Sequence, residues 1–289
     1  MILLEGPQVA AEEQAGAPAP VVGSASWLWR PATPLPEPEV RGRPTDIFYT
    51  PHPDDETLSM GVLIAAATQR GDRVIVVGLS DGRTTGAMRS VDDRLARPGP
   101  WTTHVLTQDG IAAARVGELR RAVADLGVMP ENVFLAHLDA PGTDGGSTVT
   151  VAEAQQVMRA FAERFPGATH LTMSFVAERQ LDHLDSGVAL KNLRDAGVVR
   201  SARWAVSRLW WTAASPAWSW VRPGTVALQR VRRALREYRV WNPELGEYAI
   251  GFTSVRSQFL AQAQDTRDRV HGAGSMEPTP VSPRHGLYP

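Results

Sequence analysis

Along the first two-thirds of the chain, short apolar runs alternate with longer segments in which apolar residues recur at helical spacing. Four runs have the length and composition of buried strands, namely 46–50, 73–80, 132–138 and 170–175. The segments between them predict helices at 57–70, 110–126 and 150–165. Strand-helix alternation of this kind favours an α/β fold with a mostly parallel sheet, flanked by helices and joined by right-handed crossovers.

Composition divides the chain into four parts. Residues 1–44 are rich in Ala and Pro and predict a partly mobile N-terminal arm, and residues 45–200 hold the α/β core. Residues 201–264 form a Trp-rich portion that we expect to complete the domain. From residue 265 to 289 the chain is rich in Gly, Pro and charge, which predicts a flexible tail.

Two connections and two aromatic residues are candidates for lining a substrate pocket. The segment 80–86 follows the second predicted strand and would lie near the rim of a site, although an ordinary Gly-rich loop fits it equally well. A long polar connection follows from 86 to 109, and loops of that length are usually functional or disordered. Trp218 and Trp220 lie in a Ser/Pro-rich stretch without a clear period, so we expect them to be exposed or to meet substrate.

Charge and composition exclude several classes of function. The formal net charge is −1 and the sequence pI is about 6.7, so nothing favours binding to nucleic acid. The chain has no cysteine, which rules out disulfides, thiolate ligands and a cysteine nucleophile. No apolar run is long enough to predict a membrane span. The first thirty residues lack a basic start and a continuous apolar stretch, so we expect a cytoplasmic protein.

The segment from Pro51 to Glu56, PHPDDE, places one imidazole and three carboxylates between a predicted strand and the following helix. In open α/β sheets, ligands bind at this carboxyl edge of the strands. His52 and Asp55 could both bind one cation, since imidazole and carboxylate are common Zn²⁺ ligands. Asp54 would then be free to accept or release a proton. An alternative interpretation is a turn that caps the helix and complements its dipole.

At these residues the chain resembles the LmbE-like, or PIG-L type, family of zinc-dependent de-N-acetylases. The family pattern is a (P/A)HPDDE segment after the first strand, followed later by a second, His-containing segment. The resemblance implies that His52 and Asp55 bind the metal, one Zn²⁺ or another divalent ion per chain, and that Asp54 is the general base. It also implies a Rossmann-like fold and a small-molecule substrate of the N-acetyl amino-sugar type.

The second segment of the family pattern is HxDH, and here it reads QLDH from 180 to 183. The resemblance implies that His183 is the third metal ligand. Gln180 stands where relatives have a His thought to act as general acid, and Gln can donate a hydrogen bond but cannot deliver a proton. Two further positions match the family's sugar contacts, Arg115 on a predicted helix and Asp139 after a predicted strand. We therefore expect Arg115, Asp139 and Gln180 to contact substrate.

The activity that follows from this resemblance is hydrolysis of an N-acyl, in the simplest case acetyl, group from an amino-sugar-containing small molecule or natural-product intermediate. A Zn²⁺ ion with two His ligands and one carboxylate leaves a position open for a water, whose pKa falls to about 7. Asp54 could return its proton to the leaving amine, and His104 and His137 are other candidates by residue type. Two alternatives stay open: an Fe(II) oxygenase with a 2-His-1-carboxylate triad, and a non-catalytic metal-binding relative. A homo-oligomer is possible.

Overall fold

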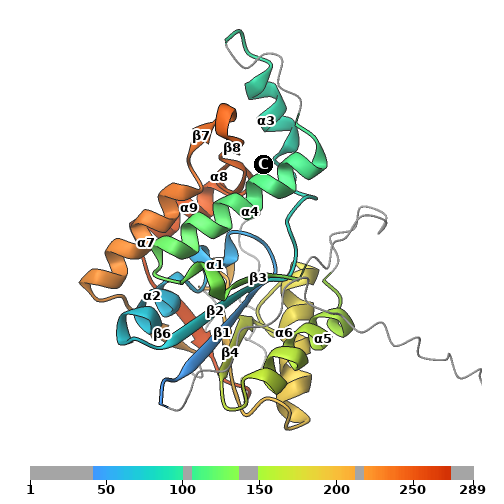
Figure 1. Ribbon diagram of the computed structural model, residues 1–289, viewed down its shortest axis with the longest axis vertical. Coiled ribbons are helices and arrows are strands. Elements are labelled where there is room, and N and C mark those ends of the chain that lie inside the picture. The colour runs from blue at the N-terminus through green and yellow to red at the C-terminus, as the bar shows by residue number, and fades with distance from the viewer. Residues whose placement is uncertain (1–41, 100–105, 137–148, 212–217, 275–289) are drawn as a thin grey trace, which may run out of the picture.

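The computed structural model describes residues 42–99, 106–136, 149–211 and 218–274. At its centre lies a seven-stranded sheet with the order β3-β2-β1-β4-β5-β9-β6 (Figure 1). Strands β1 to β4 and β5 run parallel, and only β9 is antiparallel to its neighbours β5 and β6. The strands are β1 (Thr45–Thr50), β2 (Arg73–Gly78), β3 (Val133–Leu135), β4 (Thr169–Met173), β5 (Ser201–Ala205), β6 (Ser219–Val221) and β9 (Asp268–His271). The predicted α/β class with a mainly parallel sheet is confirmed.

The chain enters the sheet at its centre and changes direction once. From β1 it moves outward through β2 to β3, then crosses back over β1 to β4 and β5. The loops that leave β1 and β4 therefore diverge to opposite sides. Such a switch point opens a crevice at the carboxyl end of the strands, where open α/β sheets bind ligands.

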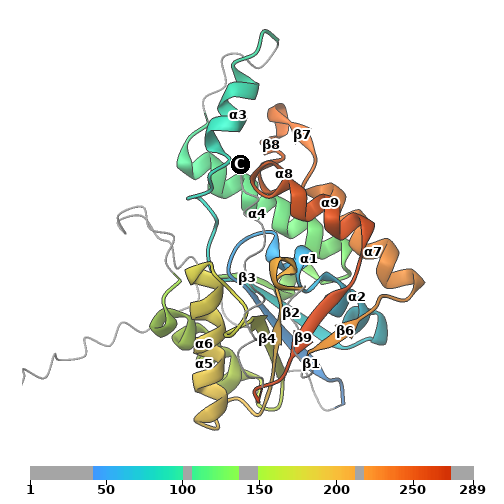
Figure 2. The same cartoon turned by 180° about the vertical axis from the view of Figure 1, so that it is seen from behind.

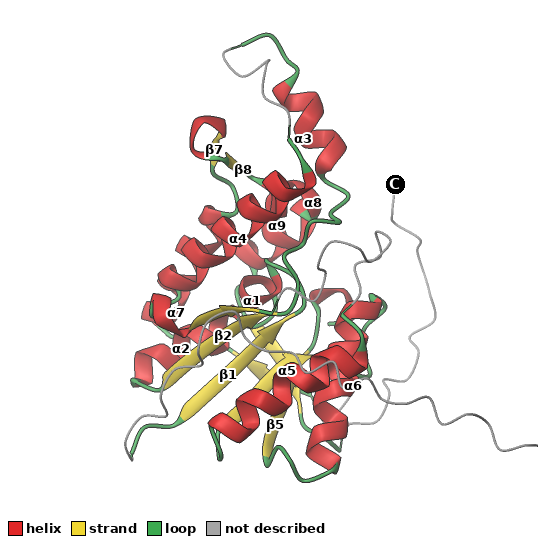
Figure 3. Ribbon diagram, turned by 45° about the vertical axis from the view of Figure 1, so that its right-hand side comes forward, coloured by secondary structure: helices red, strands yellow, loops and turns green. Residues whose placement is uncertain are grey.

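Helices cover both faces of the sheet (Figures 2 and 3). One face carries α1 (Asp55–Leu58), α2 (Gly61–Arg70), α4 (Gln108–Asp125), α7 (Thr225–Glu237) and α9 (Arg256–Gln264). The other face carries α5 (Val151–Arg164) and α6 (Leu181–Asp195). Because successive strand side chains point to opposite faces, Phe48 packs with the first group while Ile47 and Tyr49 pack with the second. This burial on both faces explains the nearly continuous apolar runs of the central strands.

The remaining elements are short and lie mostly beyond the carboxyl edge of the sheet. They are α3 (Met88–Leu95), α8 (Ile250–Ser254), the hairpin of β7 (Trp241–Asn242) and β8 (Glu247–Tyr248), and the 3₁₀ turns η1 (Pro130–Asn132), η2 (Arg208–Trp210) and η3 (Pro243–Leu245). Helix α3 occupies part of the connection expected to be a long polar loop from 86 to 109. That expectation was wrong for these residues, because Val91 and Leu95 repeat at helical spacing and pack against Ile250.

The Trp-rich portion from 201 to 264 contributes to the same core as the preceding residues. Val231 and Tyr238, the latter at the end of α7, are fully buried in one cluster with Val62 of α2 and Leu119 of α4. The prediction of a flexible tail from 265 onward was wrong at its start. Residues 268–271 form the buried strand β9, which is held by pairing with β5 and β6 rather than by local composition.

The helix expected over 57–70 is divided in two, since α1 ends at Leu58 and α2 begins at Gly61. No side chain next to α2 caps its start, but the carboxylate of Asp268 does so from β9. Asp268 Oδ2 accepts a hydrogen bond from the Leu63 amide at 2.9 Å. Burial raises the pKa of Asp268 to about 8, although the backbone amides of Leu63 and Val62 at the helix start oppose that shift. Among the described residues, no helix is both long and apolar enough to cross a membrane.

Candidate active site

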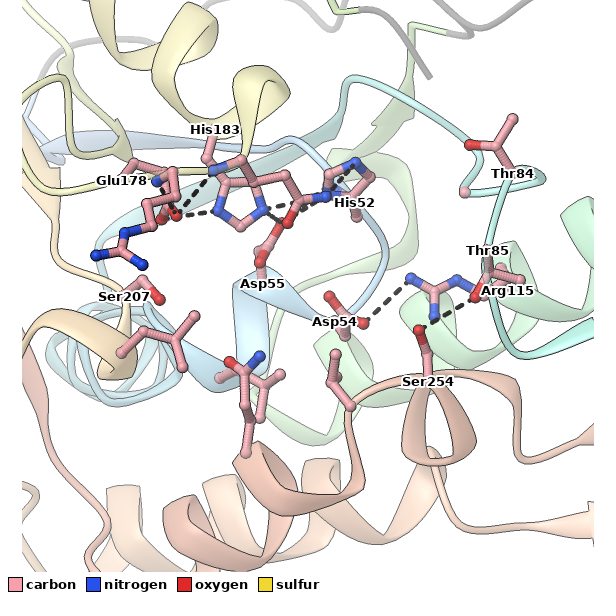
Figure 4. Close-up of a pocket in the computed structure, with 18 of the residues that line it drawn as sticks. His52, Asp54, Asp55, Thr84, Thr85, Arg115, Glu178, His183, Ser207 and Ser254 are labelled. Atoms are coloured by element: carbon pink, nitrogen blue, oxygen red, sulfur yellow. Dashed lines mark hydrogen bonds and ion pairs between the residues drawn. The ribbon is translucent and has the colours of Figure 1, made fainter. Parts of the chain in front are cut away.

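A pocket of about 580 Å³ lies at the switch point, above the carboxyl ends of β1, β2, β4 and β5. The pocket is lined by residues from six parts of the chain (Figure 4). These are the β1–α1 turn, the loop after β2, helix α4, the loop between β4 and α6, the segment after β5, and the junction of α8 and α9. Every predicted site residue that the structure describes lies in this pocket: His52, Asp54, Asp55, Arg115, Gln180 and His183. Asp139, His104 and His137 lie outside the described residues.

Three side chains in the pocket converge on one point. His52 Nδ1 lies 3.1 Å from His183 Nε2, which lies 3.1 Å from Asp55 Oδ2, and the third side of this triangle measures 3.4 Å. In a tetrahedral site with bonds of about 2.0–2.2 Å, ligand atoms stand roughly 3.3–3.5 Å apart. His52, Asp55 and His183 therefore fit one metal ion, as the resemblance implied. Two imidazoles and a carboxylate suit Zn²⁺ and other divalent transition metals.

A second layer of carboxylates orients both imidazoles. Asp182 Oδ2 lies 2.8 Å from His52 Nε2, and Glu178 Oε2 lies 2.9 Å from His183 Nδ1. Each carboxylate holds the ring nitrogen that faces away from the triangle, so the other nitrogen can present its lone pair to a metal. Metal-binding histidines almost always have such partners.

The charges of this cluster favour a cation. Burial alone would lower the pKa of His183, but Asp55 and Glu178 outweigh it and raise that pKa well above its ordinary value. Burial likewise opposes ionisation of Asp55, yet His183 and His52 lower the pKa of Asp55 far below its usual range. Three carboxylates thus surround two imidazoles in a buried site, an excess of negative charge that a divalent ion would neutralise.

Asp54 stands beside the three candidate ligands without joining them. Its backbone has a φ of 143°, unusual for a residue other than glycine, and its amide donates to Glu56 Oε2 at 2.9 Å. Glu56 is itself fixed by the Tyr238 hydroxyl, 2.6 Å from Oε1. Strained backbones of this kind cost about 1–3 kcal/mol and persist only where their surroundings impose them. Here the strain directs the Asp54 carboxylate into the pocket.

The protonation of Asp54 is set by burial and by Arg115. The residue is 6% exposed, and burial raises its pKa to about 6, although the guanidinium of Arg115 opposes that shift. Arg115 Nη2 donates to Asp54 Oδ2 at 3.1 Å and to the Pro53 carbonyl. A carboxyl with a pKa near the working pH is suited to general acid–base chemistry.

Arg115 also has hydrogen-bonding capacity to spare. It is 3% exposed, and its Nε and Nη1 atoms have no partner in the part of the chain that the structure describes. Both atoms are buried, with Nε packed under Gly82, so neither N–H group faces the open pocket. Gln180, by contrast, is exposed at the mouth, where its Nε2 lies 3.5 Å from His52 Nε2.

Sequence reasoning missed several pocket residues. Glu178 precedes His183 by five positions in a loop, and such a spacing carries no signal of an orienting carboxylate. The segment 80–86 does reach the pocket, through Gly82, Thr84, Thr85 and Gly86. Of the tryptophans, Trp210 lines the pocket, whereas Trp218 and Trp220 do not. Trp220 is 37% exposed, but Trp218 is only 6% exposed, so the expectation for Trp218 was wrong.

These features define a class: a mainly parallel α/β protein with a candidate mononuclear metal site and a free carboxylate at the sheet's switch point. The chain belongs to the PIG-L family, since the family model described as GlcNAc-PI de-N-acetylase matches residues 47–193, just over half of its length. The predicted LmbE-like, PIG-L type family is therefore confirmed.

Among curated proteins, a 1D-myo-inositol 2-acetamido-2-deoxy-α-D-glucopyranoside deacetylase of Mycolicibacterium gilvum (strain PYR-GCK) is 30% identical over 202 residues. The match covers 65% of this chain and 65% of that protein, slightly less than two thirds of each. The names of this relative and of the family model both describe removal of an acetyl group from an N-acetylated amino sugar.

Two solved structures share the fold. The antimicrobial reagent A40926 pseudoaglycone deacetylase Dbv21 aligns with a TM-score of 0.54 at 16% identity, covering 82% of this chain and 99% of that one. A deacetylase–teicoplanin complex aligns with a TM-score of 0.54 at 14% identity, covering 78% of this chain and 97% of that one. This fold differs from the double-stranded β-helix of Fe(II) oxygenases with a similar triad, so the oxygenase alternative loses its support.

Proposed function

We propose that the protein is a zinc-dependent amidohydrolase that removes an N-acyl group, acetyl in the simplest case, from a small molecule containing an amino sugar. One observation carries the proposal: His52, Asp55 and His183 present three ligand atoms within 3.4 Å of one another, while the neighbouring carboxylate of Asp54 faces the same pocket unligated. The family and its curated relative supply the class of substrate.

The residues divide the chemistry between them. A bound Zn²⁺ would activate a water and polarise the acyl carbonyl. Asp54 would take the proton from the attacking water, because its carboxyl faces the same pocket and has a pKa of about 6. Arg115 holds Asp54 in position through the Nη2–Oδ2 hydrogen bond, and the hydroxyl groups of Thr84, Thr85 and Ser254 would bind oxygen atoms of the sugar.

Release of the amine requires a proton donor. Gln180 cannot act as one. Asp54 already carries the proton taken from water beside the breaking carbon–nitrogen bond, so we assign it both roles. Glu178 and Asp182 would keep the two imidazoles fixed throughout.

The test combines metal analysis with an amide hydrolysis assay on N-acetylglucosamine derivatives. His183→Ala should lose metal. Asp54→Asn should retain metal yet lose about 10²–10⁴-fold in activity, as expected for a general base. Asp93→Asn, an exposed carboxylate on α3, is the matched control. A protein that binds zinc stoichiometrically but hydrolyses none of these amides would be the non-catalytic relative, and the proposal would be wrong.

A further inference from the structure

The two ends of the pocket differ in chemistry. Figure 4 shows Arg115, Thr84, Thr85 and Ser254 together on one side of Asp54. Ser207 and Glu178 lie on the opposite side, beyond Asp55. The three candidate metal ligands lie between these ends. The first end offers the hydroxyl groups of Thr84, Thr85 and Ser254 beside a buried guanidinium, so it is suited to a polar, hydroxyl-rich group.

The opposite end continues into apolar side chains. Ser207 is followed directly by η2, and both Leu209 and Trp210 of this turn line the pocket. Leu209 is 54% exposed, so its side chain is open to contact with a bound molecule. We call Leu209 and Trp210 the apolar shelf.

The apolar shelf is preformed. The Trp210 amide donates to the Ser207 carbonyl at 2.9 Å, which closes the 3₁₀ turn. The guanidinium of Arg179 lies 5.2 Å from the centre of the Trp210 ring, a cation–π contact that holds the indole from one side. Ser207 is 4% exposed, so the turn starts from a fixed point in the core. A fixed apolar surface beside a reaction centre is more consistent with ligand binding than with a freely moving loop.

The direction of the scissile amide connects the two ends. The carbonyl carbon must lie at the candidate metal site, and its two substituents, the alkyl chain of the acyl group and the sugar nitrogen, point away from each other. If the sugar's hydroxyl groups bind at the Arg115 end, the acyl group points toward the apolar shelf. An acetyl group ends in a single methyl carbon, which is too small to cover both a leucine and an indole.

We infer that the apolar shelf binds the hydrocarbon chain of an N-acyl group longer than acetyl, so that the enzyme is selective for N-acyl amino sugars with chains of several carbons. The inference rests on the proposed function and specifies its substrate class. The reaction is the same: water adds to the acyl carbon, the carbon–nitrogen bond breaks, and a carboxylate and a free amine leave.

The experiment measures kcat/KM for zinc-loaded protein on glucosamine amides of acetate, butyrate and hexanoate. We expect an increase of about two- to fourfold per added methylene, as partial to full burial of each group predicts. Leu209→Ser and Trp210→Ala should flatten this dependence on chain length, mainly through KM. Leu245→Ser is the matched control, because Leu245 is 73% exposed on η3 and does not line the pocket. It should keep the dependence of the parent.

A second arm uses N-acetyl substrates with either a methyl or an octyl glycoside. If efficiency follows the glycoside rather than the acyl chain, and Leu209→Ser removes that preference, the shelf binds the aglycone and our orientation is overturned. Equal efficiency across both series in parent and variants would overturn the inference while leaving the proposed function intact. No hydrolysis of any amide would overturn the proposed function itself.

Discussion

The guanidinium of Arg115 reaches the carboxylate of Asp54, with Nη2 3.1 Å from Oδ2, and both side chains are almost completely buried. This pair places a cation next to a carboxylate whose pKa is otherwise raised by burial. The same arginine has two further N–H groups, Nε and Nη1, that are buried without a partner among the described residues. One side chain therefore affects both the position and the protonation of the candidate base.

Replacing Arg115 with Met should raise the pKa of Asp54 above about 6, because the cation that favours its ionised form is removed. A general base works only when deprotonated, so the acidic limb of kcat/KM against pH should move to higher pH. Arg120→Met, an exposed position on the same helix, is the control. An acidic limb that stays in place would show that Asp54 does not control it.

The Glu178→Gln variant should bind Zn²⁺ about 10–100-fold more weakly, as is typical when the hydrogen-bond partner of a ligating histidine is altered. The amide can still accept a hydrogen bond from His183 Nδ1, but the negative charge is lost. Competition with a chromogenic chelator measures the affinity, and Glu163→Gln on the exposed face of α5 serves as the reference. Unchanged zinc affinity would remove Glu178 from the metal site.

Changing Gln180 to Ala should lower kcat by well under the roughly 10²-fold expected for loss of a general acid. The side chain is exposed, and its Nε2 lies 3.5 Å from His52 Nε2. Profiles of kcat against pH for the parent, Gln180→Ala and Gln180→His test this. A basic limb that disappears on replacing His104 or His137 would show that one of these histidines, rather than Asp54, protonates the amine.

Asp268→Ala should lower the free energy of unfolding by about 1–2 kcal/mol, the usual effect of removing an N-terminal helix cap. Asp268→Asn should have the smaller effect, since the amide oxygen can still accept from the Leu63 amide. Urea unfolding gives both values, with Asp93→Ala as an exposed control. If Asp268→Ala unfolds at the same urea concentration as the parent, the cap does not contribute to stability.

His170 should make the fold sensitive to acid. It is 2% exposed on β4, with Nδ1 2.9 Å from the Tyr49 hydroxyl, and burial lowers its pKa to about 4. In the unfolded chain its pKa is about 6.5. The unfolded state therefore binds the extra proton between these values, and its uptake lowers stability as pH falls from about 6.5 to 4.

The test is urea unfolding of the parent and His170→Gln at several pH values between 4.5 and 7.5. Below pH 6.5 the free energy of unfolding should fall less steeply with pH for the variant than for the parent, whatever the variant's stability at neutral pH. The two slopes should differ by up to about 1.4 kcal/mol per pH unit. Parallel curves for the two proteins would show that His170 does not titrate on unfolding.

The sequence alone predicted those features that are encoded locally. Each of these patterns lies within a short stretch of sequence, so it was visible without a structure. They are the apolar runs of β1, β2 and β4 and the helical spacing of α4 and α5. The PHPDDE segment could also be recognised from the sequence, because the candidate ligands His52 and Asp55 lie three residues apart in one turn. His183 was found only through the family pattern, and the structure brings it to 3.1 Å from His52 across 131 positions.

The tertiary structure decided everything that depends on distant segments meeting. Strand β9 forms because its backbone pairs with β5 on one side and β6 on the other. The charged sequence around Arg269 gives no local indication of a strand. Asp268 likewise caps a helix 205 positions earlier in the chain, and Leu209 reaches the pocket only because the segment after β5 lies beside it. Local patterns reflect the preferences of neighbouring residues, whereas a pocket is made of side chains whose proximity is fixed only when the whole sheet has assembled.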